Sequence, residues 1–341
     1  MKTLEIFDVS PYIHTAENVD KYASRYLYKF PVGGIQYFLK YLAVNLKINN
    51  DIILCFDSRS FRKDLSVKYK SSRKSAYPVY AQLDFLVEHL ERCGIPCYKV
   101  DGYEADDLIH TAVFQNYKDY DSINIYGNDK DLAHNIIDSK ITLRAINSTS
   151  NTITYHNFSK GLVKGTYIHF NTISAYKVFT GDNSDEIDSF VAEDGTTGLE
   201  VYKAMIKLIL ENPSINKYSI TATRKMIELV LKYKFSHFTQ NDLAKIRLNM
   251  DLVFPKRTEK EIKAVSISKI DKSKLMELCR MVGAYDAMKC FGSPLPQTPE
   301  DREYLAKKGK SFVNGEFAVD NDLPLTPLDS FGEVLFCREF E

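Results

Sequence analysis

The stretch Gly102-Tyr103-Glu104-Ala105-Asp106-Asp107-Leu108 places three carboxylates within four positions. A short apolar segment precedes it, and the apolar residues that follow recur at steps of three and four residues, as on one face of a helix. The sequence therefore predicts a strand-to-helix junction with the acids in the first helical turn. Because acidic residues are favoured in the first turn of any helix, this stretch alone favours an ordinary helix cap over a metal site.

Acidic residues follow apolar segments at four more places, and this repetition shifts the balance towards a metal site. The segments 4–7, 52–56, 123–126 and 178–179 are followed by Asp8, by Asp57, by Asp129 and Asp131, and by Asp182 and Asp185. The carboxyl ends of parallel strands meet at one edge of an open sheet, where binding sites form. We therefore expect these acids to lie in one site with those of the 102–108 stretch.

Strand-like and helical patterns alternate through the first half of the chain. Strands are predicted at 4–7, 51–57, 95–100 and 122–126, a hairpin within 141–155, and helices at 33–47, at 79–94, after Glu104 and near Asp129. This alternation predicts an α/β fold with a mostly parallel sheet flanked by helices. The chain is predicted to be mainly helical from about 171, with a strand at 251–254, and to end in a loosely held tail from about 293.

Composition limits the protein class. With 341 residues and 44% hydrophobic content, the chain can form one large and one smaller domain. Basic and acidic residues both number 45, so net charge indicates no partner. Of six cysteines, the only close pair, Cys93 and Cys97, lacks the second pair or histidines of a zinc site, so buried thiols in a reducing compartment are expected. No apolar run reaches membrane-spanning length, and we expect a soluble cytoplasmic protein.

The segment after Asp57 is basic and aromatic. It contains a single acid, Asp64, and the following residues: Arg59, Phe61, Arg62, Lys63, Lys68, Tyr69, Lys70, Arg73, Lys74 and Tyr77. Such a mixture suits a phosphate backbone with unpaired bases stacked beside it. A solvated charged loop is the alternative, which the pattern alone favours, but the segment leaves the same sheet edge as Asp57.

Together these motifs resemble the flap endonuclease and 5′→3′ exonuclease family, which includes the 5′-nuclease domain of bacterial DNA polymerase I and phage 5′-nucleases of the RNase H type. The matching motifs are Phe56-Asp57, Phe61-Arg62, Tyr69-Lys70 with Arg73, the 102–107 stretch, Asp129-Lys130-Asp131-Leu132 and Thr180-Gly181-Asp182-Asn183-Ser184-Asp185, with a fainter match at 241–247. The resemblance implies a PIN-like nuclease domain at 1–185 with a helical arch at about 58–78. It also implies a mainly helical DNA-binding region at 186–292, followed by the tail at 293–341.

The resemblance further implies a structure-specific 5′-nuclease that hydrolyses phosphodiesters with two or more Mg²⁺ ions, for which Mn²⁺ substitutes. Carboxylates hold such ions directly or through their waters, and two ions can activate a water and stabilise the leaving oxygen. The implied ligands form a first group and a second group. The first contains Asp8, Asp57, Glu104, Asp106 and Asp107, and the second contains Asp129, Asp131, Asp182 and Asp185.

Substrate contacts are implied for the basic segment. Lys70 and Arg73 would contact the scissile phosphate as catalytic residues, and Tyr69 would stack on a terminal base. The implied nucleic-acid-binding residues are Arg62, Lys68, Tyr69, Lys70, Arg73 and Lys74. The expected substrates are DNA with 5′ ends or flaps and RNA/DNA hybrids such as RNA primers, cut by a monomer in a bacterial or phage-infected cell. A replication protein is an expected partner of the tail.

The chain departs from the family pattern at three places. Val9 follows Asp8 where the family has glycine, and Glu186 stands where asparagine is usual. The segment Gly195-Thr196-Thr197-Gly198 lacks the full glycine pattern of a helix-hairpin-helix, so the family's duplex contact and K⁺ site are not carried over. Two alternatives remain. A PIN-type ribonuclease would use a similar site, although it is usually smaller, and a non-catalytic nucleic-acid-binding protein would be expected to have lost some of the acids.

Overall fold

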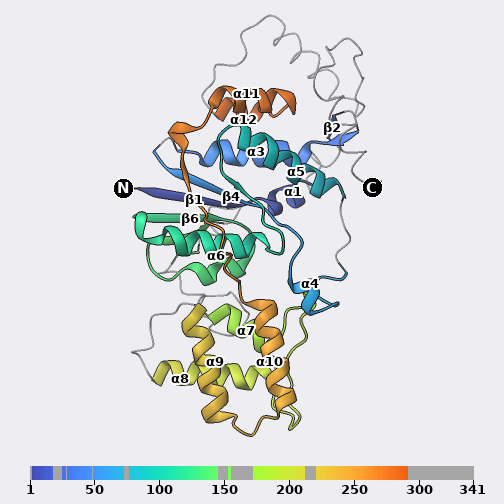
Figure 1. Cartoon of the computed structure of the whole chain (residues 1–341), viewed down its shortest axis with the longest axis vertical. Coiled ribbons are helices and arrows are strands. Elements are labelled where there is room, and N and C mark those ends of the chain that lie inside the picture. Colours follow the sequence, from blue (N-terminus) through green and yellow to red (C-terminus); the bar gives the residue numbers. More distant parts are fainter. Residues whose placement is uncertain are drawn as a thin grey trace, which may run out of the picture.

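A mixed sheet forms the centre of the molecule (Figure 1). The computed structural model describes residues 2–17, 25–27, 29–47, 49–72, 77–144, 153–154, 172–211 and 220–290. In these residues the sheet consists of β1 (Thr3–Asp8), β4 (Asp51–Cys55), β5 (Cys97–Tyr98), β6 (Ser122–Tyr126), β7 (Ile141–Arg144), β8 (Ile153–Thr154) and β9 (Val265–Ser266). The strand order is β5-β4-β1-β6-β7-β8, and β9 pairs with β4 beside β5. Strands β5, β4, β1, β6 and β7 are parallel, whereas β8 and β9 are antiparallel to their neighbours. The expected α/β sheet is confirmed.

Strand β1 lies at the centre of the sheet, between β4 and β6. All six of its residues are buried, because helices cover both faces of the sheet. The chain order reverses around β1, and such a switch point opens a crevice beyond the carboxyl ends of the strands. Asp8, the last residue of β1, lies at that edge.

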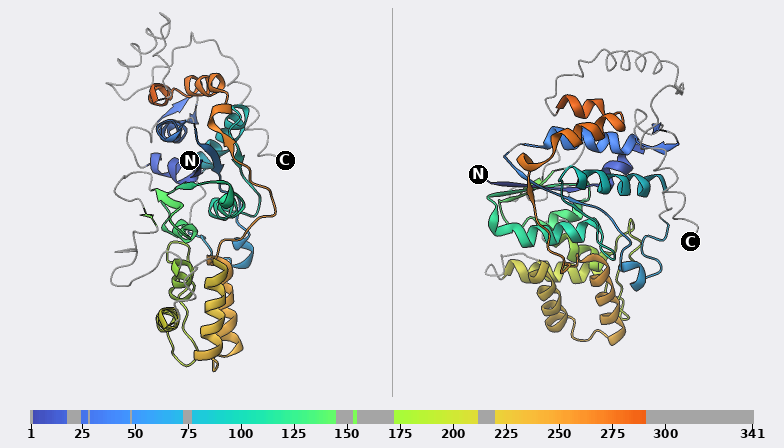
Figure 2. Two further views of the ribbon diagram at one scale, coloured as in Figure 1. Left: turned by 90° about the vertical axis from the view of Figure 1, so that its left-hand side faces the viewer. Right: turned by 45° about the horizontal axis from the view of Figure 1, so that its top comes forward.

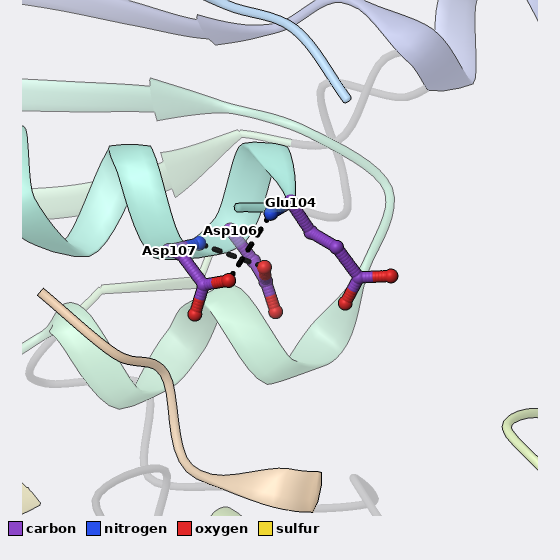
Figure 3. A group of neighbouring side chains, drawn as sticks. All are labelled: Glu104, Asp106 and Asp107. Carbon is purple, nitrogen blue, oxygen red and sulfur yellow. Dashed lines mark hydrogen bonds between the residues drawn. The ribbon is translucent and has the colours of Figure 1, made fainter. Parts of the chain in front are cut away.

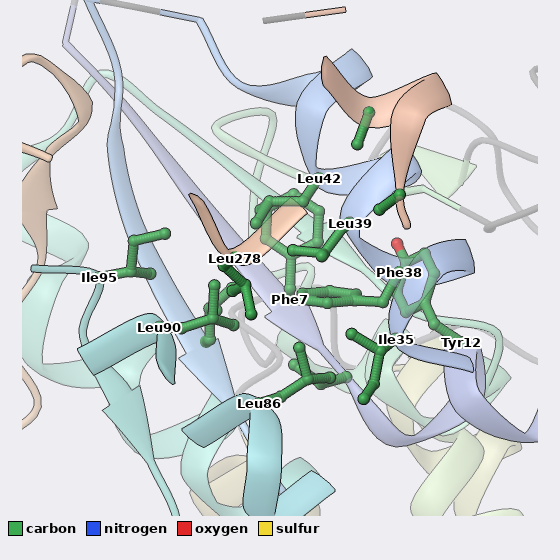
Figure 4. Close-up of a cluster of buried hydrophobic side chains, with 14 of the residues drawn as sticks. Phe7, Tyr12, Ile35, Phe38, Leu39, Leu42, Leu86, Leu90, Ile95 and Leu278 are labelled. Atoms are coloured by element: carbon green, nitrogen blue, oxygen red, sulfur yellow. The ribbon is translucent and has the colours of Figure 1, made fainter. Parts of the chain in front are cut away.

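One face of the sheet is covered by α1 (Ser10–Glu17), α3 (Gly33–Asn45), α5 (Tyr77–Arg92), α11 (Lys272–Met281) and α12 (Tyr285–Cys290) (Figure 1). In α3, apolar residues at steps of three and four form its buried stripe. Phe38 from this stripe contacts Phe7 of β1 and Tyr12 of α1 (Figure 4). Burying one such side chain contributes about 1.5–3 kcal/mol, so this cluster stabilises the layer.

The opposite face is covered by α6 (Ala105–Asn116) with the 3₁₀ turns η1 (Tyr117–Asp119) and η2 (Lys130–Asn135). Leu108, Ile109 and Ala112 of α6 pack on Ile6 and Ile125 of the sheet, as the spacing of apolar residues predicts. The predicted strand at 95–100 is confirmed only as the two-residue β5. β7 and β8 form the predicted hairpin, whose turn lies outside the described residues.

A helical module follows, made of α7 (Ile173–Thr180), α8 (Gly198–Glu211), α9 (Ile220–Lys234) and α10 (Gln240–Val253), with its own core (Figures 1 and 2). The mainly helical character expected here is confirmed. The predicted strand at 251–254 is wrong, because α10 continues to Val253. Thr239 and Asp242 form a capping box at its start, and Ile246, Asn249 and Leu252 are buried at three-residue steps.

The chain then returns to the sheet as an extended strap along α6 (Figure 1). Backbone N–H groups of Lys256, Thr258 and Ile262 donate to side chains of Asp107, Thr111 and Gln115, which lie at four-residue steps on α6. After the strap come β9 and helices α11 and α12, which pack on the α3 side of the sheet. The last described part of the region predicted as one helical unit, 186–292, therefore packs with the sheet and not with the helical module.

Two further expectations concern whole-chain features. Cys55, Cys93, Cys97 and Cys279 are buried and free, as predicted for structural thiols. Within the part of the chain that the structure describes, no helix combines the length and apolarity required to cross a bilayer. The predicted tail at 293–341 lies outside the described residues.

Candidate active site

A cavity of about 170 Å³ lies at the carboxyl edge of the sheet. Eight of the nine predicted metal ligands line it: Asp8, Asp57, Glu104, Asp106, Asp129, Asp131, Asp182 and Asp185. They come from the end of β1, the segment after β4, the start of α6, the start of η2 and the loop after α7. Asp57 also accepts a hydrogen bond from the backbone N–H of Ala105 at 2.8 Å, which joins the end of β4 to the first turn of α6.

Asp107 lies away from this cavity, although oxygens of Glu104, Asp106 and Asp107 come within 4.8 Å of one another (Figure 3). It is completely buried. Its Oδ1 accepts from Arg62 and from the backbone N–H of Lys256, and its Oδ2 accepts from Arg62 and from the backbone N–H of Glu104. Four hydrogen bonds occupy the acceptor positions of one carboxylate. In this structure the oxygens of Asp107 already have protein partners, and the expectation that Asp107 binds metal stays a prediction.

Arg62 is also placed differently from the expectation that it binds nucleic acid. Its side chain is 1% exposed, and its guanidinium makes five hydrogen bonds. The acceptors are Asp107 twice, Glu104 and the carbonyls of Leu252 and Phe254. A guanidinium has five N–H donors, so none is left for a phosphate. Arg62 instead holds α4 (Arg62–Leu65), α6 and the end of α10 together.

Tyr69 is buried as well, which corrects the expectation that it stacks on a base. Its hydroxyl donates to Glu104 Oε2 at 2.9 Å, and its ring packs against Ile187 and Leu252. Burial, followed by the charges of Glu104 and Asp185, raises the pKa of Tyr69. The hydroxyl therefore stays protonated and orients Glu104.

Lys70 reaches into the cavity from the basic segment. Its Nζ lies 2.6 Å from Glu104 Oε1 and 3.8 Å from Asp185 Oδ2. Burial lowers the pKa of Lys70, but the charges of Glu104 and Asp185 outweigh it, and the net shift is upward. Lys68 is exposed and pairs with Asp188, while Arg73 and Lys74 lie outside the described residues. The predicted helical arch at 58–78 contains one four-residue helix, α4, in its described part up to Ser72.

Lys177, in the last turn of α7, is a site residue that was not predicted from the sequence. Its ammonium bridges two predicted metal ligands, pairing with Asp131 and lying 2.5 Å from Asp182 Oδ2. Burial raises the pKa of Asp182, but hydrogen bonds from Lys177 and Ser184 outweigh it and lower it overall. In the sequence, Lys177 could have been found as a basic residue one helical turn before the Thr180–Asp185 motif.

The remaining negative charge in the cavity is poorly compensated. Burial, followed by repulsion from Asp57, Asp129 and Asp106, raises the pKa of Asp8 well above its usual value. Burial and then Asp107 do the same for Asp106. Burial and then Asp129 raise the pKa of Asp131 to about 7. Carboxylates in this state gain free energy from any added cation.

The donor set fits divalent metal ions. Among the described residues, Oδ1 of Asp8 and Oδ1 of Asp131 are buried without a hydrogen-bond partner. Buried polar atoms nearly always have partners, so unpaired carboxylate oxygens in a cavity indicate a bound group. Hard divalent cations prefer clustered carboxylate oxygens as ligands.

Similarity to known proteins extends over most of this chain. Residues 13–162 match the family model of the 5′-3′ exonuclease N-terminal resolvase-like domain. A 5′-3′ exonuclease of Aquifex aeolicus is 24% identical over 287 residues, which is 80% of this chain and 96% of that protein. A 5′-3′ exonuclease of Mycoplasma pneumoniae is 27% identical over 243 residues, or 68% of this chain and 77% of that protein. The flap endonuclease of bacteriophage T5, solved in complex with DNA and metal ions, is 14% identical with a TM-score of 0.45, covering 86% of this chain and 100% of that one.

Proposed function

Because this chain belongs to the 5′-3′ exonuclease family, we propose that it is a Mg²⁺-dependent nuclease that cuts phosphodiesters near the 5′ ends or in the flaps of DNA. The observation that carries this proposal is the convergence of eight carboxylates from five separate segments on one cavity. A structural role does not account for them, because Asp8 and Asp131 each leave a buried oxygen unpaired among the described residues.

The eight carboxylates would hold the divalent ions. Asp8, Asp57, Glu104 and Asp106 form one set, and Asp129, Asp131, Asp182 and Asp185 form the other. When bound, the ions lower the pKa of a water and neutralise charge on the attacking and leaving oxygens. Mn²⁺ prefers similar oxygen ligands and would substitute for Mg²⁺.

Lys70 and Lys177 would interact with the substrate. The ammonium of Lys70 lies at Glu104, and that of Lys177 lies between Asp131 and Asp182. A phosphodiester entering the cavity brings its own negative charge, and we expect Lys70 to turn from Glu104 to a non-bridging phosphate oxygen. A preorganised cation at this position stabilises charge that develops in the transition state.

Part of the cavity wall is apolar. Tyr69, Ile187, Leu252 and Val253 line it beside the acids. In such partly apolar surroundings electrostatic interactions between the lysines and a phosphate are stronger than in bulk water. Outside the cavity, Lys68 is exposed, and we expect it to contact a flanking phosphate.

The test offers the purified protein, with Mg²⁺, four labelled substrates: a 5′-flap DNA, a nicked duplex, an RNA/DNA hybrid and single-stranded RNA. Cleavage of the flap or nicked duplex from the 5′ side, lost in EDTA and in Asp182→Asn, supports the proposal. Cleavage of single-stranded RNA alone would replace it by a PIN-type ribonuclease. No cleavage of any substrate with either Mg²⁺ or Mn²⁺ would refute it.

A further inference from the structure

The base of the basic segment is fastened to the loop that follows α7. Lys68 Nζ lies 3.1 Å from Asp188 Oδ2, and the backbone N–H of Lys70 donates to the carbonyl of Asp185 at 3.1 Å. Two more hydrogen bonds end on one side chain: Ser71 Oγ donates to Glu186 Oε2 at 2.5 Å, and Ser72 N donates to Glu186 Oε1 at 2.8 Å. Residues 68–72 therefore contact 185–188 at four points.

Backbone strain marks the same contact from both sides. In the described residues, three non-glycine residues have positive φ, namely Lys29, Lys70 and Glu186. Lys70 (φ 51°) and Glu186 (φ 57°) face each other across the contact. A long side chain in this left-handed region costs free energy and persists only when the surrounding structure holds it there.

The Glu186 carboxylate is not needed to close its own loop. Asp182 and Ile187 exchange backbone hydrogen bonds of 2.9 Å in both directions, and the N–H of Asp185 donates to the carbonyl of Asp182. The hydrogen bonds of the carboxylate go to Ser71 and Ser72, more than 100 positions away in sequence. Its contribution is therefore to the basic segment.

The Glu186 carboxylate thereby fixes Lys70, the residue just before Ser71 and Ser72. Lys70 lies between Tyr69, anchored on Glu104, and Ser71, anchored on Glu186. With both neighbours held and its own N–H bound to Asp185, Lys70 keeps the backbone conformation that brings its ammonium 2.6 Å from Glu104.

We propose that Glu186 is a positioning residue that holds Ser71 and Ser72 and thereby keeps the Lys70 ammonium at the acidic cavity. This inference rests on the proposed function, in which Lys70 contacts the scissile phosphate. A substrate phosphate would then meet an ammonium that is held at the cavity and needs only to turn from Glu104, so the benefit is expected in kcat.

The first experiment does not depend on activity. Hydrogen exchange of the 68–72 amides is measured in wild type, Glu186→Asn, Glu186→Gln and the control Glu259→Ala, which removes an exposed glutamate elsewhere. Asparagine tolerates the left-handed backbone but is too short to reach the serines, whereas glutamine keeps the length. We expect faster exchange at Ser72 in Glu186→Asn alone, with an unchanged Tm. Equal exchange in Glu186→Asn and wild type would overturn the proposal.

The second experiment is a double-mutant cycle of Glu186→Asn and Lys70→Ala, in which kcat is measured on the 5′-flap substrate. We expect Glu186→Asn to lower kcat by about tenfold, since a misplaced reacting group can cost up to about a hundredfold. In the Lys70→Ala background the same change should have less than about a twofold effect, since the two residues act as one unit. Glu186→Gln should restore most of the activity.

The outcomes separate this inference from the proposed function. An equal loss in both backgrounds would mean that Glu186 does not act through Lys70 and would overturn the inference while leaving the nuclease assignment intact. If wild type cuts none of the substrates, the proposed function fails, and the exchange measurement still decides whether Glu186 holds the segment.

Discussion

Arg62 and Asp107 form an ion pair that is almost completely shielded from water. Their side chains are 1% and 0% exposed, and two hydrogen bonds of 2.8 Å join them. Two charges buried in this way are costly to separate, because the partner left behind cannot be hydrated. Asp106, the preceding residue, lines the cavity instead, and repulsion opposes its charge. Adjacent helix positions point in different directions, so the two aspartates have different roles.

This difference gives a prediction for two neighbouring isosteric changes. Asp107→Asn should lower the free energy of unfolding by about 3 kcal/mol or more, because it removes the carboxylate that makes two hydrogen bonds to the buried Arg62 and leaves Glu104 as the remaining charged partner in the described residues. Asp106→Asn should leave the Tm unchanged or higher in EDTA, because it removes a charge that burial and Asp107 disfavour, yet it should reduce cleavage to near background. Thermal melting and flap cleavage measure both. Equal Tm values for Asp107→Asn and Asp106→Asn would contradict the different roles assigned to the two aspartates.

The pH dependence of the metal-free protein should report on Asp131. Burial and Asp129 raise its pKa from 3.8 to about 7 in the folded state, so the folded protein holds this proton more tightly than the unfolded chain does. Its contribution to stability is therefore present at low pH and is lost as the pH rises from about 4 to about 7. In EDTA the wild type should melt at a lower temperature at pH 8 than at pH 5.5, and Asp131→Asn should show a smaller difference. If the Tm difference between pH 5.5 and pH 8 is the same in wild type and Asp131→Asn, this pH dependence does not come from Asp131.

The acidic residues and their convergence could be predicted from sequence, whereas their individual partners could not. Each of the five acidic positions follows an apolar segment, and parallel strand ends meet at one edge. That Asp107 turns to Arg62, and that Lys177 bridges Asp131 and Asp182, depends on tertiary contacts across 45 and 46 sequence positions. No local pattern marks the contacts of Arg62 with Asp107 and of Lys177 with Asp131, whereas Lys177 lies five positions before Asp182 and that contact is local.

At the level of elements, α4 and the residues after it connect the sheet domain with the helical module. Arg62 binds the carbonyls of Leu252 and Phe254 at the end of α10, and Lys68 and Lys70 contact the loop after α7. The same segment carries exposed and buried basic residues. Basic composition therefore does not distinguish the residues that are expected to bind a phosphate from those that hold the fold.

Salt dependence should separate these two kinds of basic residue. Lys70→Ala should lower turnover and reduce the slope of log K against log salt for DNA binding by about one unit, since one phosphate contact is lost. Arg62→Lys should leave that slope unchanged but lower the Tm, because three ammonium donors cannot replace five guanidinium donors. The measurements are cleavage and DNA binding between low and moderate salt. A changed slope in Arg62→Lys would mean that its side chain reaches the DNA.

Elements with a long hydrophobic pattern could be predicted, and elements made by tertiary pairing could not. The strands at β1, β4 and β6 and the helices α3, α5 and α6 follow from periodicity. β9 has two residues, and the strap before it is fixed by side chains of α6, so neither has a pattern of its own. The apolar run at 251–254 resembled a strand, but the capping box and the spacing of α10 keep it helical to Val253.

At the scale of the whole molecule, the carboxylates around the acidic cavity repel one another, and the other interactions of the fold outweigh this repulsion. Eight carboxylates face it with two lysines, Lys70 and Lys177, among them. The acids come from the end of β1, the segment after β4, the starts of α6 and η2 and the loop after α7, so repulsion between them acts between the sheet domain and the helical module. Cation binding should therefore stabilise the whole protein as well as enable catalysis.

Thermal melting in EDTA, Mg²⁺, Mn²⁺ and Ca²⁺ at constant ionic strength tests this coupling. A ligand that binds only the folded state stabilises it by about 2.7 kcal/mol at a hundredfold excess over Kd, which corresponds to roughly 2 °C or more for a chain of this size. All three cations should raise the Tm, although Ca²⁺, with its looser geometry, should support little cleavage. Asp129→Asn/Asp131→Asn should gain less from the cations and be at least as stable as wild type in EDTA, because it removes two mutually repelling charges. If wild type has the same Tm under all four conditions, the acids do not form a cation site. A double mutant less stable than wild type in EDTA would show that the ion pair between Lys177 and Asp131 outweighs the repulsion.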